Sequence, residues 1–180
     1  MKKFTRALFL VLAVLTALTV CVSAYDLSTF KDYKADHWAN KALSHAVDNK
    51  LLGGYEDNTV RADRDITRAE MGAIVNRAFG SFVEATKFPY LDVEDVAWFY
   101  KDMKKAVNMG TMQGSNNLLR PDDAITREEA FIVIARAYSQ KNTEFSVLEQ
   151  YEDYENISGW AKEYLSFLTE NDYVNGFDDG

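Results

Sequence analysis

The hydrophobic and polar positions of this chain repeat one pattern three times. After each of three tryptophans, Trp38, Trp98 and Trp160, apolar residues return at helical spacing. The tryptophans lie 60 and 62 residues apart, and an aromatic residue, an aspartate and a glycine keep register with them. These matching positions are Phe30, Tyr90 and Tyr151, then Asp32, Asp92 and Asp153, then Gly54, Gly114 and Gly176. Spacing of this kind predicts an amphipathic helix in each repeat.

A second helix is predicted in the first two repeats. Residues 66–70 and 125–129 both follow the sequence Ile-Thr-Arg-x-Glu, and an apolar run comes after each. Thr-x-x-Glu ahead of such a run is a capping box, in which the two side chains satisfy backbone amides of the first turn. Each complete unit is therefore predicted to be helix, loop and capped helix, with linkers at 81–89 and 139–150. We expect the repeated glycines to end the first helices as left-handed caps.

The first 24 residues predict a secretory signal peptide. Three cations, Lys2, Lys3 and Arg6, precede an uncharged apolar run over 7–20, and a peptidase site follows at 22–24. We expect cleavage after Ala24. The alternative of a transmembrane anchor needs about 20 apolar residues, which is more than this run supplies. A lipoprotein is a third option, although Val20 before Cys21 does not suit lipoprotein processing.

Composition and charge narrow the choice of partner. Cys21 is the only cysteine, so the cleaved chain would have no disulfide and no thiolate ligand. The formal net charge is −8, and removal of residues 1–24, with three basic and no acidic residues, would leave −11. We exclude nucleic acid as a partner, because phosphate binding requires a basic face. We also expect no membrane contact after cleavage, and an anionic polymer would need a few positioned arginines to hold it.

Recognisable enzyme motifs are missing from the sequence. The only histidines are His37 and His45, and neither belongs to a His-Glu-x-x-His helix. There is no Gly-rich phosphate loop and no Gly-x-Ser-x-Gly turn. The acidic turns near Asp57 and Asp63 lack the spacing of an EF-hand calcium loop. We therefore predict a protein that is not an enzyme and uses no cofactor or metal, while a paired-carboxylate glycosidase stays open on composition alone.

Taken in order, the motifs resemble those of one repeat family. An aromatic-x-Asp start, a Trp-Ala helix, a Gly-Tyr-x-Asp turn and an Ile-Thr-Arg-Ala-Glu helix start are similar to the S-layer homology (SLH) repeat. The resemblance covers essentially the whole cleaved chain, with repeat 1 at 25–80, repeat 2 at 90–138 and a truncated repeat 3 at 151–180. It implies an all-α fold, in which tandem helix–loop–helix units form a pseudo-threefold bundle. Because repeat 3 stops before a second helix, we expect a fragment of a longer protein.

The SLH resemblance also implies a function. Such repeats hold exported proteins at the bacterial cell surface by binding secondary cell-wall polysaccharide, often with pyruvate ketals, or in some groups peptidoglycan. We therefore expect a secreted protein that is anchored non-covalently to the cell wall. The alternative is a structural surface-layer module that self-associates through protein–protein contacts.

Candidate ligand-binding residues follow from the position of two arginines. Arg68 and Arg127 lie in the first turn of the capped helices, where the helix dipole disfavours a cation by about 0.3–1 kcal/mol. This placement indicates a carboxylate ligand, bound by the guanidinium and by helix amides. We predict grooves in which each arginine meets the aspartate and tryptophan of the next repeat. The sets are Arg68 with Asp92 and Trp98, and Arg127 with Asp153 and Trp160, and Asp32 and Trp38 are the matching residues of repeat 1.

Each of these residues also has a structural interpretation. The tryptophans can be core anchors, and the aspartates can cap a helix or close a turn. The arginines can pair with aspartates of a neighbouring repeat and join the units. The second repeat departs from the family at Phe99 and at Asn116-Asn117, which leaves open how its groove binds.

Overall fold

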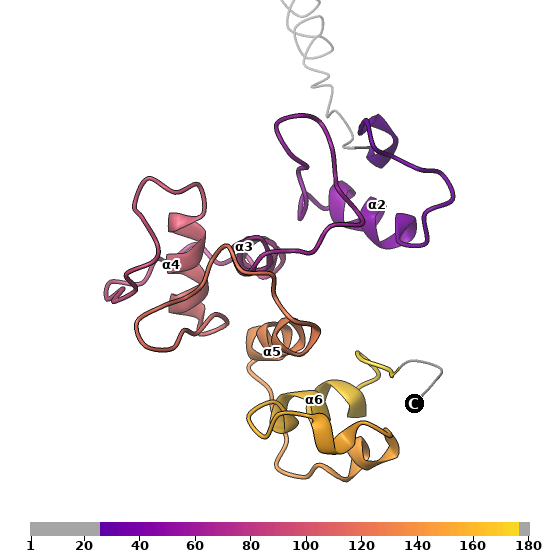
Figure 1. Cartoon of the computed structure of the whole chain (residues 1–180), viewed down its shortest axis with the longest axis vertical. Coiled ribbons are helices and arrows are strands. Elements are labelled where there is room, and N and C mark those ends of the chain that lie inside the picture. Colours follow the sequence, from indigo (N-terminus) through magenta and orange to yellow (C-terminus); the bar gives the residue numbers. More distant parts are fainter. Residues whose placement is uncertain (1–25, 177–180) are drawn as a thin grey trace, which may run out of the picture.

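The computed structural model describes residues 26–176, and this part of the chain is helical. Its five α-helices are α2 (Asn40–Asp48), α3 (Arg68–Ala78), α4 (Tyr100–Met109), α5 (Arg127–Ala137) and α6 (Lys162–Glu170). Three short 3-10 helices accompany them: η1 (Leu27–Thr29), η2 (Ser146–Gln150) and η3 (Tyr154–Asn156). Within residues 26–176 there are isolated β-bridges but no sheet, so the predicted all-α class is confirmed (Figure 1). The signal peptide predicted at 1–24 lies outside the described residues.

The second helices begin with the predicted capping boxes. Thr67 Oγ1 accepts the Glu70 amide at 3.2 Å, and Glu70 Oε2 accepts the Thr67 amide at 2.8 Å. Thr126 and Glu129 form the same reciprocal pair, with both distances at 3.2 Å. The first helices have no side-chain cap at their N-cap residues, Ala39, Phe99 and Ala161. No helix within residues 26–176 has both the length and the apolar character needed to cross a membrane.

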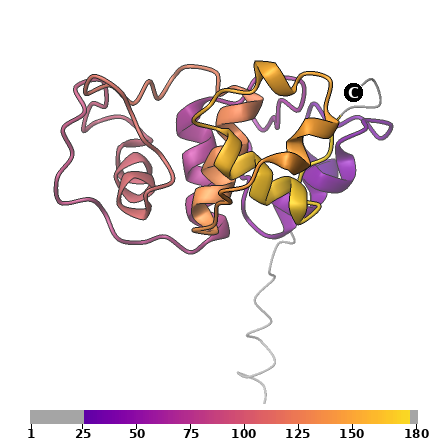
Figure 2. The ribbon, with the colours of Figure 1, turned by 90° about the horizontal axis from the view of Figure 1, so that it is seen from below.

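Helices from neighbouring units make the main contacts. Helix α3 packs against α4, the first helix of the next unit, and α5 packs against α6 in the same way. Helices α3 and α5 also lie side by side, so they form the centre of the molecule (Figures 1 and 2). Helix α2 instead packs on η1, with a small apolar cluster of its own. The second helix of a unit is therefore buried mainly by the following unit.

Two apolar cores lie between the helices of neighbouring units. The larger joins α3 and α4 around Val75, Met103 and Ala106, and the smaller joins α5, α6 and η2. Leu148 of η2 is 1% exposed, although it belongs to the predicted linker 139–150. In the other predicted linker Ala85 is buried, and its amide donates to the Lys104 carbonyl at 3.1 Å. Both linkers are therefore packed parts of the units that they join.

An aromatic ring in each unit leaves no room for a side chain at the repeated glycine. A Cβ atom on Gly54 would lie 2.2 Å from Phe30 Cε1, and one on Gly176 would lie 2.7 Å from Tyr151 Cε1. A Cβ on Gly114 would lie 2.6 Å from the Tyr90 ring and 2.2 Å from the Leu118 carbonyl oxygen. The prediction that these glycines cap the first helices is wrong, because those helices end earlier. Their C-caps are Asn49, Gly110 and Asn171.

Gly54→Ala is expected to lower the free energy of unfolding by about 2 kcal/mol. The added methyl group would collide with Phe30 and with the Thr59 carbonyl oxygen, 2.9 Å away, and the φ of +71° disfavours alanine. Gly53→Ala is the matched control, since nothing lies within 4 Å of its added Cβ, and it should change stability by under about 0.5 kcal/mol. Urea unfolding measures both variants, and equal losses would contradict the packing argument.

Candidate functional site

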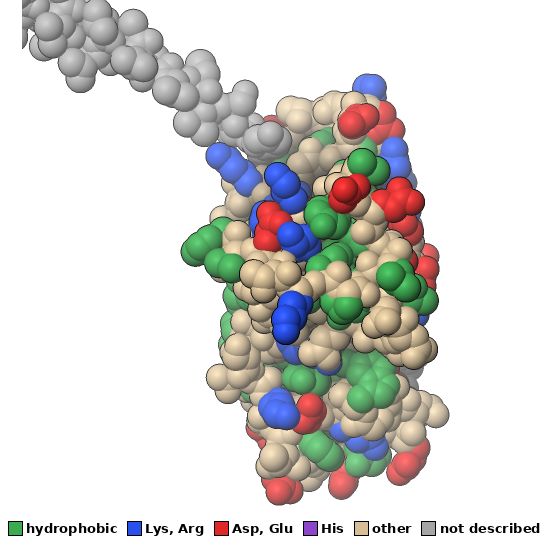
Figure 3. All heavy atoms as spheres, turned by 90° about the vertical axis from the view of Figure 1, so that its left-hand side faces the viewer, with side chains coloured by type: hydrophobic (Ala, Val, Ile, Leu, Met, Phe, Trp, Pro, Cys, Tyr) green, Lys and Arg blue, Asp and Glu red, His purple; other side chains and the backbone are tan. Residues whose placement is uncertain are grey.

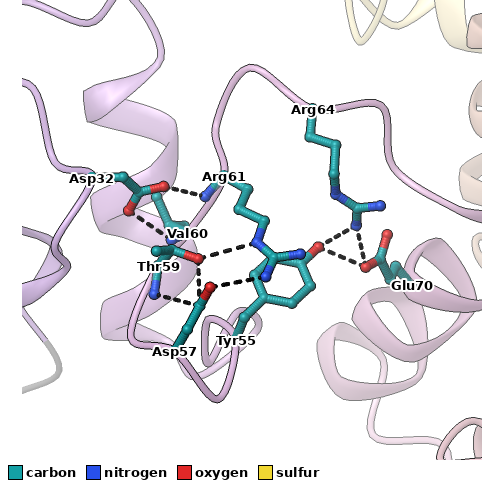
Figure 4. A network of polar contacts seen from close by, with 8 residues as sticks. All are labelled: Asp32, Tyr55, Asp57, Thr59, Val60, Arg61, Arg64 and Glu70. Atoms are coloured by element: carbon teal, nitrogen blue, oxygen red, sulfur yellow. Dashed lines mark hydrogen bonds and ion pairs between the residues drawn. The ribbon is translucent and has the colours of Figure 1, made fainter.

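The aspartate at the start of each complete unit holds the loop between its helices. Both oxygens of Asp32 accept backbone amides, from Val60 at 2.8 Å and from Arg61 at 2.6 Å (Figure 4). Burial alone would raise the pKa of Asp32, but these amides hold it below its usual value. The equivalent contacts of the second unit run to Asp92 from Leu119 at 3.0 Å and Arg120 at 2.7 Å. Each aspartate thus stabilises a loop residue with positive φ, which for Arg61 is +53°.

Two arginines of the first loop lie over one tyrosine. The Arg61 guanidinium is 4.0 Å from the centre of the Tyr55 ring, and the Arg64 guanidinium is 5.2 Å from it. Arg61 donates to Asp57 Oδ2 at 3.0 Å and to Thr59 Oγ1 at 3.1 Å. The loop therefore presents two cations in fixed positions around an aromatic ring (Figure 4).

Glu70 joins this loop to helix α3. Its Oε1 accepts the Tyr55 hydroxyl at 2.6 Å and also Arg64 Nη2, while Oε2 caps the Thr67 amide. Burial alone would raise the pKa of Glu70, but these hydrogen bonds outweigh it and keep the pKa below its ordinary value of 4.5. Burial and the bond to Glu70 raise the pKa of Tyr55. At neutral pH the cluster holds an ionised carboxylate, a neutral phenol and a cation.

A groove of about 930 Å³ is lined by this loop, by helix α3 and by Trp98 of the next unit. Four cations line it, namely Lys50, Arg61, Arg64 and Arg77, together with three carboxylates, Glu56, Asp57 and Glu70. The groove thus has a small excess of positive charge in a protein whose net charge is −8. Cations that can bind a carboxylate and an aromatic face that can pack on a sugar ring suit an anionic carbohydrate.

All three tryptophans lie at the surface, so their interpretation as core anchors is wrong. Their exposed fractions are 88% for Trp38, 63% for Trp98 and 54% for Trp160. In the second and third units the next residue turns inward, since Phe99 is 7% exposed and Ala161 is fully buried. Figure 3 shows the side of the molecule on which α4 lies, where hydrophobic side chains are exposed among charged ones. Trp98 is therefore exposed beside the groove and stays a candidate for ligand contact.

The structure places Arg68 inside the protein, so it does not line this groove. Its side chain is 5% exposed and donates to the Leu119 carbonyl at 2.8 Å, the Gln113 carbonyl at 3.0 Å and Glu129 at 2.9 Å. Burial lowers the pKa of Arg68, and the charge of Glu129 opposes that change. Asp92 was predicted to bind the ligand together with Arg68, but the two side chains are linked only through Leu119. The Leu119 amide donates to Asp92, and the Leu119 carbonyl accepts from Arg68. Arg68 thus joins two units, as its structural interpretation proposed, with glutamate in place of aspartate.

The arginines that line the groove are Arg61, Arg64 and Arg77, which the sequence analysis did not select. A signal for them was present in the Gly-Tyr-x-Asp turn, because its Tyr55 and Asp57 fix the Arg61 guanidinium. In the second predicted groove, Arg127, Asp153 and Trp160 are all exposed, and the Arg127 guanidinium lies 5.1 Å from the Phe131 ring. Those three residues stay candidates for ligand contact.

Among residues 26–176, no group of three or more histidine, cysteine, aspartate or glutamate side chains could hold a metal ion.

Comparison with known proteins matches two of the three predicted repeats to one family. Residues 29–71 and 89–131 each match the family profile described as the S-layer homology domain. Relatives include exoglucanase XynX of Acetivibrio thermocellus (28% identical over 82% of this chain and 14% of the relative) and the cellulosome-anchoring protein of the same organism (32%, 67% and 28%). Another is the surface-layer 125 kDa protein of Lysinibacillus sphaericus (26%, 97% and 14%). The chain spans less than a third of the length of each of these relatives. The names of the anchoring protein and the surface-layer protein agree with the predicted localisation at the cell surface.

Arg68→Ala is expected to lower the free energy of unfolding by roughly 3 kcal/mol, because two backbone carbonyls and Glu129 lose a buried donor. Arg127→Ala is the matched control at the equivalent, exposed position, and it should cost under about 1 kcal/mol. Urea unfolding of both variants measures the difference. A loss as large for Arg127 as for Arg68 would show that burial is not the cause.

The lowered pKa of Glu70 predicts a loss of stability in acid. A carboxyl group whose pKa is lower in the folded state stabilises the protein above its ordinary pKa, and this contribution disappears as pH falls. Thermal unfolding should therefore show a midpoint that falls once the pH drops below about 4.5, the ordinary value for glutamate. Glu70→Gln should be less stable by roughly 1–2 kcal/mol at pH 7 and show a shallower acid loss. Parallel pH profiles of variant and parent would exclude Glu70 as a source.

Proposed function

Because this chain belongs to the S-layer homology family, we propose that it anchors an exported protein non-covalently to the bacterial cell wall. The ligand in this proposal is secondary cell-wall polysaccharide, bound in the groove between the first loop and Trp98. One observation carries the proposal, namely that Arg61 and Arg64 are held around Tyr55 within a groove that an exposed tryptophan also lines.

The chemistry of the groove supports a polysaccharide that carries carboxylates. A guanidinium presents parallel N–H donors that match the two oxygens of a carboxylate, such as that of a pyruvate ketal. Trp98 offers an apolar face for the sugar ring that carries it. The net charge of −8 means that attraction must come from these local cations and not from the protein as a whole.

The names of the relatives support an anchoring role. One is described as a cellulosome-anchoring protein and another as a surface-layer protein. Others are named as glucanases, and this chain matches only 14% of the exoglucanase. In our proposal the repeats are the part that such proteins use to stay at the cell surface, and catalysis belongs to the rest of their length.

Catalysis by this groove would require a carboxyl group that is protonated near neutral pH. A glycosidase acid has a raised pKa, but Asp57 and Glu70 both have lowered ones. For Asp57 the causes are hydrogen bonds from Thr59 and Arg61. The lowered pKa values of these two groups therefore favour binding over hydrolysis.

Self-association is the second candidate function, and one surface feature favours it. Aromatic side chains from three units meet at the surface, where Tyr138 stacks on Tyr173 at 5.5 Å and meets Phe79 edge-on at 5.2 Å. Their exposed fractions are 44%, 57% and 39% respectively. Such a strip could pack against another copy of the chain.

Co-sedimentation with purified cell-wall sacculi tests the proposed function. The chain should pellet with intact sacculi and stay in solution with sacculi stripped of secondary polysaccharide by acid. Pelleting with both kinds of sacculi would indicate that the ligand is peptidoglycan, and pelleting with neither would favour self-association.

Trp98→Ala should weaken wall binding by about tenfold or more, because it removes the apolar face that lines the groove. Trp38→Ala is the matched control, since Trp38 is 88% exposed and does not line the groove. Binding isotherms on intact sacculi measure both. Equal affinity of the two variants would show that Trp98 does not contact the ligand.

A further inference from the structure

Units 1 and 2 share one loop framework but carry different side chains on it. Asp32 and Asp92 hold the same backbone amides, and Arg61 and Arg120 occupy the same left-handed position. Three other loop positions change: Tyr55 to Ser115, Arg64 to Asp123, and Lys50 to Gly110. The second unit thus loses two cations and an aromatic ring, and it gains a carboxylate where the first has a guanidinium.

The capping glutamate has different partners in the two units. In unit 1, Glu70 Oε1 accepts Tyr55 and Arg64 from its own loop. In unit 2, Glu129 Oε1 accepts the buried Arg68 at 2.9 Å and also Arg120 at 2.9 Å. A positive side chain from the preceding unit therefore occupies the place that the loop cation takes in unit 1.

The exposed charge of the second loop is already balanced. Arg120 Nη2 pairs with Glu129 at 2.9 Å, and Arg120 Nη1 lies 3.7 Å from Asp123. An incoming carboxylate would meet Asp123, which is half exposed, before it reached a guanidinium. Repulsion between the carboxylate of Asp123 and that of the ligand would oppose binding.

Arg64 of the first loop, unlike Arg120, keeps donors that a ligand can use. Its side chain is 38% exposed, and both of its hydrogen bonds within residues 26–176 use the same nitrogen, Nη2. Nη1 and Nε can therefore donate to a ligand while Glu70 and Tyr55 hold the guanidinium in place. Positioning of this kind lowers the entropy lost when a carboxylate binds.

We propose that unit 1 contains the only groove within residues 26–176 that binds a carboxylated sugar, and that Arg64 selects it. Asp123 at the equivalent position of unit 2 excludes the same ligand. This inference rests on the proposed function, and it adds a stoichiometry of one and a specificity-determining residue.

The three tryptophans, one in each unit, allow the site to be located directly. The probe is a methyl glucoside that carries a pyruvate ketal, and the control is its methyl ester, which has no charge. Proton–nitrogen spectra of the chain contain one indole signal for each tryptophan, assigned by single Trp→Phe substitutions. The ketal should shift the Trp98 signal in a saturable manner and leave the Trp160 signal in place, while the ester should shift neither.

Arg64→Asp, which copies the second loop onto the first, should weaken ketal binding by about 10- to 100-fold. Asp123→Ala tests the exclusion from unit 2, because it removes the carboxylate beside Arg120, and it should allow the ketal to shift the Trp160 signal as well. Arg64→Lys keeps the charge without the paired donors and should bind with intermediate affinity, which separates ligand contact from a folding defect. A Trp160 shift equal to that of Trp98 in the unsubstituted chain, or full affinity in Arg64→Asp, would overturn the inference.

Sacculus binding separates this inference from the proposed function. A chain that pellets with intact walls but shows no saturable Trp98 shift with the ketal would retain its anchoring function and lose the specificity assigned to Arg64. A chain that binds the ketal at Trp98 but does not pellet with walls would retain the site and lose the anchoring function.

Discussion

The carboxylate of the capping-box glutamate Glu129 is the contact on which the joining of the first two units depends. One oxygen of Glu129 caps the first turn of α5, and the other binds Arg68 at the start of α3. Arg68 is almost fully buried, so its charge requires a partner at this point, and removal of either group would leave the other uncompensated. The start of one helix and its contact with the preceding unit are therefore coupled through a single side chain.

The parts of the fold that the sequence predicts are those decided over a few residues. The capping boxes need only a threonine and a glutamate three positions apart, and both form as expected. The role of Gly54 was missed because Phe30, which demands it, lies 24 residues earlier in the chain. The burial of Leu148 was missed for a similar reason, since its core forms only when α5 and α6 pack together.

The candidate site was predicted in part, and Arg68 shows why the rest was not. An arginine in the first turn of a helix is unfavourable, and its repetition was interpreted as a sign of a carboxylate ligand. The partner is Glu129, 61 residues away in the sequence, and not a ligand. A sequence does not distinguish a buried arginine from an exposed one, so Arg68 was selected while Arg64 and Arg61 were not. Trp98 lines the groove of the first unit, so its predicted contact with a ligand stays a prediction.

In each loop, the residues that fix the backbone differ from those that face solvent. One fold can therefore present different side chains to a ligand. Backbone amides held by Asp32 or Asp92, and rings packed on Gly54 or Gly114, fix the path of the chain. Arg64 pairs with the partly buried Glu70, but Asp123 lies outside that framework, in an exposed ion pair with Arg120 that contributes little to stability. A change of sign at such a position therefore alters what the groove can bind at small cost to folding. The second unit repeats this framework, and in our proposal the exposed residues of each loop decide whether that unit binds the ligand.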